Sequence, residues 1–215
     1  MLKLYYSPGA CSLAPHILLE ELGLPYRLEL TPVAEGATRT AEYLAINPKG
    51  RVPVLMTEQG EVLTEVPAIA LYLARQANHP VLFPYDPLAA ARCLEWCNWL
   101  SGTLHAIAFG ELWRPARFTD DAALHAAIQA KGKDNVFEGY TYIEQRMAER
   151  DWAVGHAYTL VDPFLLVFYR WGNRIGVDMR AGYPGFTRHA ERMLQRSAVQ
   201  RALQQESINI WEKAA

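Results

Sequence analysis

The most informative part of the sequence is the stretch Leu2-Lys3-Leu4-Tyr5-Tyr6-Ser7-Pro8-Gly9-Ala10-Cys11-Ser12-Leu13-Ala14-Pro15. The run 2–6 is rich in β-formers and ends just before Pro8-Gly9, a pair that is typical of turns. Apolar residues at helical spacing then predict a helix over 13–22, which Gly23 ends. The stretch therefore predicts a strand, a turn and a helix, with one thiol at their junction.

The segments that follow alternate between strand and helix patterns. In order, they are a strand (26–31), a helix (40–46), two strands (53–57 and 61–63) and a helix (67–77). Gln59-Gly60 predicts a hairpin between the last two strands, and Pro67 suits the first position of the last helix. The order βαβαββα, with a parallel βαβ unit before a hairpin and a helix, is typical of a thioredoxin-like domain.

A proline-rich stretch, 79–87, predicts a linker, because proline has no backbone donor and breaks regular structure. After it, only helical patterns are found. Helices are expected over 88–111, 120–150 with a break allowed at its glycines, 164–169 after the capping box Thr159–Asp162, 188–195 and 198–205. We therefore expect an α/β plus all-α fold, with a thioredoxin-like domain over 1–78 and an all-helical domain over 88–215.

The composition excludes several classes of protein. The 215 residues are 51% hydrophobic, which is enough for a full core, and the net charge of -2 argues against a nucleic-acid binder. No apolar run reaches the length of a membrane span, and the N-terminal run is too short for a signal peptide. Three cysteines cannot form a closed disulfide framework. We expect a cytoplasmic protein without a membrane or nucleic-acid partner.

Cys11 is the strongest candidate for chemistry. It lies between a predicted strand end and a helix start, where unpaired backbone N–H groups and the positive end of the helix favour a thiolate with a lowered pKa. The alternative is a buried, unreactive cysteine. Because Ala14 stands three residues later, there is no Cys-x-x-Cys pair, and a redox cycle would need a second thiol from solution. This points to glutathione chemistry.

The remaining polar candidates are less specific. Cys93 and Cys97 are four residues apart on a predicted helix, but no histidine pair completes a ligand set, so we expect core packing and no metal. Pro53 begins a strand and is either a cis proline or an ordinary strand entry. Glu65 precedes a helix and could pair with an amine or only complement the helix end. His105 could be a site residue or an ordinary helix histidine.

Three motifs in this order resemble the bacterial, beta-class glutathione S-transferases. They are the stretch 4–17 around Cys11, the segment Ile46-Asn47-Pro48-Lys49-Gly50-Arg51-Val52-Pro53-Val54-Leu55, and Leu63-Thr64-Glu65-Val66-Pro67-Ala68-Ile69. The helical half also fits through residues 96–98, His105 and the box at 159–162. The resemblance covers essentially the whole chain.

The resemblance implies a homodimeric transferase that uses glutathione as its co-substrate. The catalytic residues would be Cys11, Tyr6 and His105. The glutathione-binding residues would be Val52, before a cis Pro53, with Glu65, Val66 and Asn98. The apolar pocket for an electrophile would contain Phe109, Trp113 and Trp171.

The sequence also departs from the family pattern. Val66 stands where relatives have Ser or Gly, Ala106 where they often have Lys, and the loop 31–38 lacks their lysines, which leaves Arg39 as the nearest base. Losing one hydrogen bond to a charged group costs roughly 1.5–3 kcal/mol, so Val66 would weaken glutathione binding about 10- to 100-fold.

Two hypotheses from different classes follow. The first is an enzyme that activates the glutathione thiolate and transfers it to an apolar electrophile or exchanges it with a disulfide. The second is a non-catalytic partner or ligand carrier of the same fold, which the weakened carboxylate site at Val66 favours. A glutathione-dependent isomerase or dehalogenase is a third reading that no residue selects.

Overall fold

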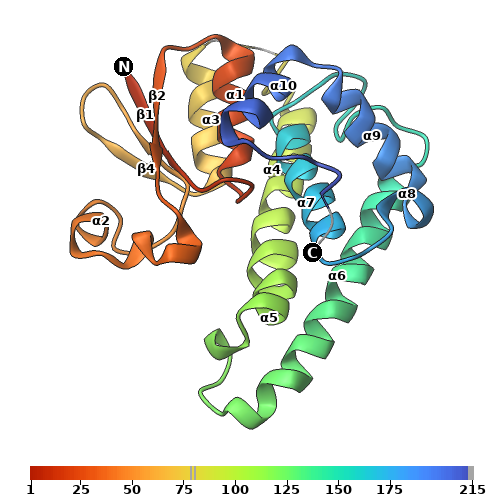
Figure 1. The fold of residues 1–215 in the computed structure, drawn as a ribbon. Coiled ribbons are helices and arrows are strands. Elements are labelled where there is room, and N and C mark those ends of the chain that lie inside the picture. The colour runs from red at the N-terminus through yellow and green to blue at the C-terminus, as the bar shows by residue number, and fades with distance from the viewer. Residues whose placement is uncertain (78, 80, 213–215) are drawn as a thin grey trace.

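The computed structural model describes residues 1–77, 79 and 81–212. The N-terminal half forms a four-stranded sheet in the order β2-β1-β3-β4 (Figure 1). Its strands are β1 (Leu2–Tyr6), β2 (Tyr26–Leu30), β3 (Val54–Met56) and β4 (Val62–Thr64). β1 is parallel to β2 and antiparallel to β3, and β3 is antiparallel to β4. The thioredoxin-like order expected from the sequence is confirmed.

Helices cover the two faces of this sheet. Alternation along β1 directs Leu2, Leu4 and Tyr6 into the main core, where α1 (Leu13–Leu22) and α3 (Val66–Gln76) also pack. Tyr5 points to the opposite face and packs with Tyr43 of α2 (Ala41–Ile46). The short 3₁₀ turns η1 (Val33–Glu35) and η2 (Ala37–Arg39) connect β2 to α2. α1 and α3 therefore lie between the sheet and the second half of the chain (Figure 1).

The second half is helical throughout its regular structure. Its elements are α4 (Pro87–Trp99), η3 (Leu100–Phe109), α5 (Gly110–Trp113), η4 (Pro115–Arg117), η5 (Ala122–Leu124), α6 (His125–Met147), α7 (Val161–Arg174), α8 (Met179–Gly182), α9 (Pro184–Leu194) and α10 (Ser197–Glu206). The sequence did not predict α8. α7 is buried along nearly its whole length and packs on α1. α10 also packs on α1. This packing joins the two halves through one core. Pro80 of the expected linker lies outside the described residues.

Several helices differ from the sequence expectation. α7 and α9 begin three and four residues before the runs expected from 164 and 188. The helix expected over 88–111 runs through α4, η3 and α5, but η3 is a π-helix, in which each turn is wider than an α-turn. The break allowed in α6 does not occur. A Cβ on Gly132 would lie 2.5 Å from the Leu112 nitrogen, and one on Gly139 would lie 2.7 Å from Leu104. These glycines therefore allow α6 to approach the preceding helical run closely.

Candidate active site

A cavity of about 800 Å³ opens between the turn after β1 and the helical run η3–α5. The N-terminal half contributes the turn 7–11, the segment 50–53 and the residues 64–66. The helical half contributes residues of η3 that repeat every four positions, Ser101, His105 and Phe109, with Gly102 and Ala106 beside them. This spacing follows from the wide π-helical turn, which directs side chains four or five residues apart to one face.

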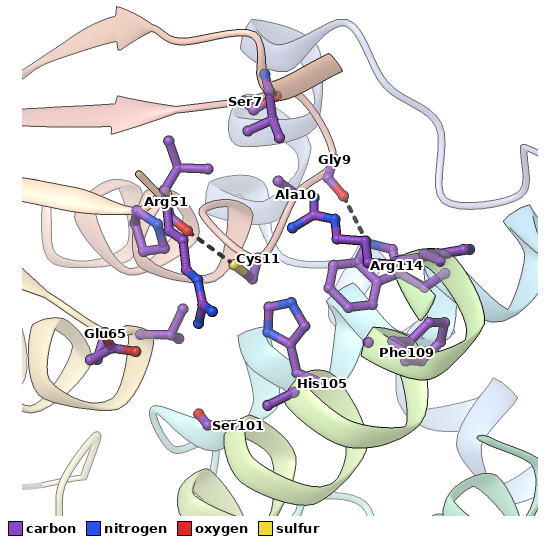
Figure 2. Close-up of a pocket in the computed structure, with 18 of the residues that line it drawn as sticks. Ser7, Gly9, Ala10, Cys11, Arg51, Glu65, Ser101, His105, Phe109 and Arg114 are labelled. Carbon is purple, nitrogen blue, oxygen red and sulfur yellow. Dashed lines mark hydrogen bonds between the residues drawn. The ribbon is translucent and has the colours of Figure 1, made fainter. Parts of the chain in front are cut away.

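Most of the site residues expected from the sequence meet in this cavity. Those that line it are Cys11, Val52, Pro53, Glu65, Val66, His105, Phe109, Trp113 and Trp171. Figure 2 shows Cys11 and Glu65 from the N-terminal half facing His105 from the helical half. Side chains up to 160 residues apart in sequence thus surround one space.

Two expected residues are not brought to the cavity. Tyr6 lies on the core face of β1, buried, with its ring 6.0 Å from the His16 ring. Asn98 is exposed near the end of α4. The first residue of this helical run that lines the cavity is Ser101. In this chain neither side chain lines the space around Cys11.

The environment of Cys11 is opposite to the one expected. The thiol is buried and donates a hydrogen bond to the Val52 carbonyl at 3.5 Å. Loss of water raises the pKa of Cys11 to about 12, although its backbone hydrogen bond and the nearby Arg114 and Arg51 act in the opposite direction. The expectation of a lowered pKa was wrong, because burial outweighs the positive helix end. Cys11 is a neutral thiol at pH 7.

This pKa predicts how Cys11 reacts. Because only the thiolate reacts with iodoacetamide, its alkylation rate should rise about tenfold per pH unit from pH 7 to 10 without a plateau. Mass spectrometry of the peptide that contains Cys11 measures the rate, and Cys11→Ala is the control that identifies this peptide's signal. Saturation between pH 7 and 8 would contradict the prediction, since it would reveal a stable thiolate.

The segment beside Cys11 carries backbone groups into the cavity. The Val52–Pro53 peptide bond is cis, as the resemblance implied. Glu65, with a positive φ of 70°, directly precedes α3, whose first residue Val66 is buried at the cavity wall. Lys49 binds the Glu65 carboxylate at 2.6 Å and the Thr64 hydroxyl at 2.7 Å. A positive φ at a non-glycine residue costs roughly 1–3 kcal/mol of conformational free energy. Such strained residues cluster at functional sites.

The opposite wall is aromatic. The Trp171 ring lies 4.9 Å from His105, 5.0 Å from Phe109 and 5.0 Å from Trp113, each in an edge-on arrangement. Burial and the positive charges of Arg114, Arg51 and Arg117 lower the pKa of His105 to about 4. The imidazole is therefore neutral at pH 7 and can donate one N–H to an anion. The three residues expected to form an apolar pocket are in contact with each other.

Sequence reasoning missed the arginines of the site. Arg51, Arg114 and Arg117 all line the cavity, and Figure 2 shows Arg51 and Arg114 on either side of Cys11 and His105. Arg51 stood within a quoted motif, next to Val52. Arg114 and Arg117 stand three residues apart, just after the helix expected over 88–111. Two arginines at this spacing beside Trp113 were the sequence signal for a positively charged site. The cavity is thus lined by cations, although the sequence lacks the lysines of the family pattern.

Gly9 is held on both sides by the helical half. Its N–H donates to Glu206 Oε2 at 2.8 Å, and its carbonyl accepts from Trp171 Nε1 at 2.9 Å. Glu206 also contacts His16 Nδ1 at 2.8 Å, and both side chains are fully buried. Gly9 has a φ of 67°, and a Cβ there would lie 2.4 Å from Arg170. The turn that carries Cys11 is thus fixed by α7 and α10.

Within residues 1–77, 79 and 81–212, no cluster of three or more His, Cys, Asp or Glu side chains is arranged to hold a metal ion. None of the helices described combines the length and apolar character needed to cross a bilayer.

Comparisons with known proteins agree on one family. The sequence profile of the glutathione S-transferase N-terminal domain matches residues 9–76, and that of the C-terminal domain matches residues 115–197. The chain is 30% identical to glutathione S-transferase GstA of Escherichia coli O157:H7, over 96% of this chain and all of the relative. It is 34% identical to glutathione S-transferase GST-4.5 of Xanthomonas campestris, over 97% of this chain and all of the relative.

Solved structures give the same result. A glutathione transferase homologue from Sulfitobacter with bound glutathione superposes with a TM-score of 0.90 and 32% identity, covering 97% of this chain and 99% of that one. A sphingomonad glutathione S-transferase complexed with glutathione gives 0.83 and 35%, covering 96% and 100%. With both domains matched and relatives aligned over their full length, the chain belongs to the glutathione S-transferase family.

Proposed function

We propose that this protein binds glutathione in the cavity, stabilises its thiolate and transfers it to an electrophilic, largely apolar substrate or to a disulfide. The observation that carries the proposal is the meeting of Cys11, Val52, Glu65 and His105 around one space at the domain junction. The glutathione bound in two of the similar structures supports it.

The cysteinyl and γ-glutamyl parts of glutathione would each have complementary groups in this cavity. The backbone of Val52, beside the cis proline, would pair with the cysteinyl residue. Glu65 would bind the γ-glutamyl ammonium, in competition with Lys49. The Val66 N–H at the start of α3 would donate to the γ-glutamyl carboxylate, because the first N–H groups of a helix have no partner within it.

The sulfur would be activated by electrostatics. Glutathione loses its thiol proton to solvent, and the thiolate is stabilised by the positive potential of Arg51 and Arg114. His105, a neutral imidazole, can donate one hydrogen bond to it, and the neutral Cys11 thiol can do so by turning its one S–H away from the Val52 carbonyl. The thiolate then attacks an electrophilic carbon, a carbon–sulfur bond forms, and the leaving group departs with its electron pair. With a disulfide, a new S–S bond forms while the old one breaks and releases a thiolate.

Calorimetric titration with reduced glutathione tests this proposal. We expect micromolar to low-millimolar binding, and Cys11→Ala should still bind. Incubated with oxidised glutathione, whose disulfide exchanges with a protein thiol and releases one reduced glutathione, Cys11→Ala should form no mixed disulfide at this site. Absence of heat at several millimolar glutathione would reject the enzyme and favour the non-catalytic partner.

The position of Val66 gives a sharper prediction. Val66→Ser adds a hydroxyl that can donate to the γ-glutamyl carboxylate, so glutathione should bind about tenfold more tightly than to the wild type. Val66→Ala is the matched control, since it removes similar volume without adding a donor. Equal affinities for the Ser and Ala variants, measured by the same titration, would show that residue 66 does not contact this carboxylate.

We further propose that the protein is a homodimer of the cytoplasm. The family resemblance of the sequence supports the dimer, and three buried cysteines without a disulfide favour a reducing compartment. Light scattering coupled to gel filtration measures the mass of the assembly.

A further inference from the structure

The cavity carries a marked excess of positive charge. Its described lining contains five arginines and, as the one carboxylate, Glu65. Arg39 adds a sixth cation close by, since a Cβ on Gly50 would lie 2.8 Å from its guanidinium. A pocket for purely apolar electrophiles has no need of this charge, because burying cations against apolar groups is unfavourable.

Not all of these arginines are available to a ligand. Arg170 and Arg174 both bind the Glu212 carboxylate, at 2.7 and 3.0 Å. Glu65 is already bound by Lys49. In contrast, Arg51, Arg114 and Arg117 have no carboxylate partner within the described residues. These three cations are left facing the cavity.

The three belong to different sides of the site. Arg51 precedes Val52 and lies, like Arg39, on the side that would hold glutathione. There it can bind a carboxylate of glutathione. Arg114 and Arg117 come from the helical half: Arg114 directly follows Trp113 of the aromatic wall, and Arg117 ends η4. Both residues are exposed, and both line the cavity. They therefore lie where the second substrate would enter.

We propose that Arg114 and Arg117 bind an anionic group, such as a carboxylate, on the electrophilic co-substrate. Resting on the proposed function, this assigns the substrate class: an aromatic or apolar electrophile that bears an acid. The rings of Phe109, Trp113 and Trp171 would contact its apolar body, and the two guanidinium groups would contact its acid.

The charges of the site also favour an anion in that place. Loss of water and the like charges of Arg114, Arg51 and Arg39 lower the pKa of Arg117 to about 10. Both causes lower the pKa of Arg114 as well. A bound carboxylate between these groups relieves their mutual repulsion and replaces lost solvent contacts with charge-assisted hydrogen bonds.

Calorimetry with three ligands tests the assignment: glutathione, S-benzylglutathione and S-(4-carboxybenzyl)glutathione. The carboxylated conjugate should bind the wild type about tenfold more tightly than the benzyl conjugate. In the double variant Arg114→Gln/Arg117→Gln this ratio should fall to near one. Arg174→Gln is the matched control, because it removes a cavity charge that already has a carboxylate partner, and it should keep the ratio.

Each outcome has a distinct meaning. If glutathione and both conjugates fail to bind, the proposed function is wrong and this assignment is wrong with it. If glutathione and the benzyl conjugate bind but the carboxylated one gains nothing, only the assignment is overturned. If Arg174→Gln abolishes the ratio as strongly as the double variant, the preference arises from general potential and not from Arg114 and Arg117.

Discussion

Replacing Asp162 by Ala should lower the free energy of unfolding by about 3–5 kcal/mol, which corresponds to a melting temperature roughly 10 °C lower. The fully buried carboxylate accepts hydrogen bonds from the Ala153 N–H at 2.9 Å and the Thr159 N–H at 2.7 Å. It also contacts the Thr159 hydroxyl at 3.1 Å and His189 Nε2 at 3.0 Å. Alanine would leave these buried groups without an acceptor, and each unsatisfied group adds a desolvation penalty.

Chemical denaturation of wild type and variants measures this effect. Thr159→Val is the matched control, because it removes only the hydroxyl, which donates to Asp162 at 3.1 Å and accepts from the Val161 N–H at 3.4 Å, and it should cost only about 1–2 kcal/mol. A loss below about 1 kcal/mol for Asp162→Ala would mean that water enters and satisfies the freed donors. The result matters for the site, because Asp162 lies in the first turn of α7, the buried helix that carries Arg170 and Trp171 to Gly9.

The elements of the sheet domain were predictable because each has a local signal. The helix predicted over 13–22 is α1 as observed, since its apolar face and Gly23 fix both ends. The helix expected over 40–46 is α2, and its N-cap is Thr40, whose side chain accepts a hydrogen bond from the Tyr43 N–H. The hairpin at Gln59-Gly60 followed from the turn signal, and Gly60 has a φ of 85°.

The helical domain was less predictable because tertiary packing overrides local preference. Gly132 and Gly139 weaken a helix in isolation, yet both lie within α6 where a side chain would collide with the neighbouring helical run. The π-helical widening of η3 has no sequence pattern of its own, although it determines which residues between Ser101 and Phe109 face the cavity. Asn98, which was assigned from the family resemblance, lies on α4 before this widening and does not line the cavity.

The candidate site could be predicted in its position but not in its electrostatics. Cys11 and His105 were found, and both line the cavity. The pKa of Cys11 depends on how completely the thiol is buried and on distant arginines such as Arg114, neither of which is local in sequence. The position at a helix start predicts one contribution, which lowers the pKa of Cys11. The larger contribution, desolvation, raises this pKa and can be seen only in the packed structure.

Glu206→Ala should also destabilise the protein by about 3–5 kcal/mol, and unlike Asp162→Ala it should weaken glutathione binding directly. The fully buried Glu206 carboxylate joins α10 to the turn before Cys11, through the Gly9 N–H at 2.8 Å and His16 Nδ1 at 2.8 Å. Without it, both buried groups lose their acceptor. Gly9 would then be held only through its carbonyl, by Trp171 and Arg170.

Glu206→Gln separates the two effects, because the amide keeps the shape and one acceptor oxygen for the Gly9 N–H. Glu206→Gln should recover most of the stability and nearly all of the glutathione affinity. Glu206→Ala, titrated at a temperature where it remains folded, should bind glutathione at least about tenfold more weakly than the wild type. If Glu206→Ala loses stability but binds glutathione as the wild type does, Glu206 supports only the domain junction. Weaker binding in Ala and not in Gln would show that α10 positions Cys11 through Gly9, so that the helical half contributes to the glutathione side of the site as well as to the wall opposite it.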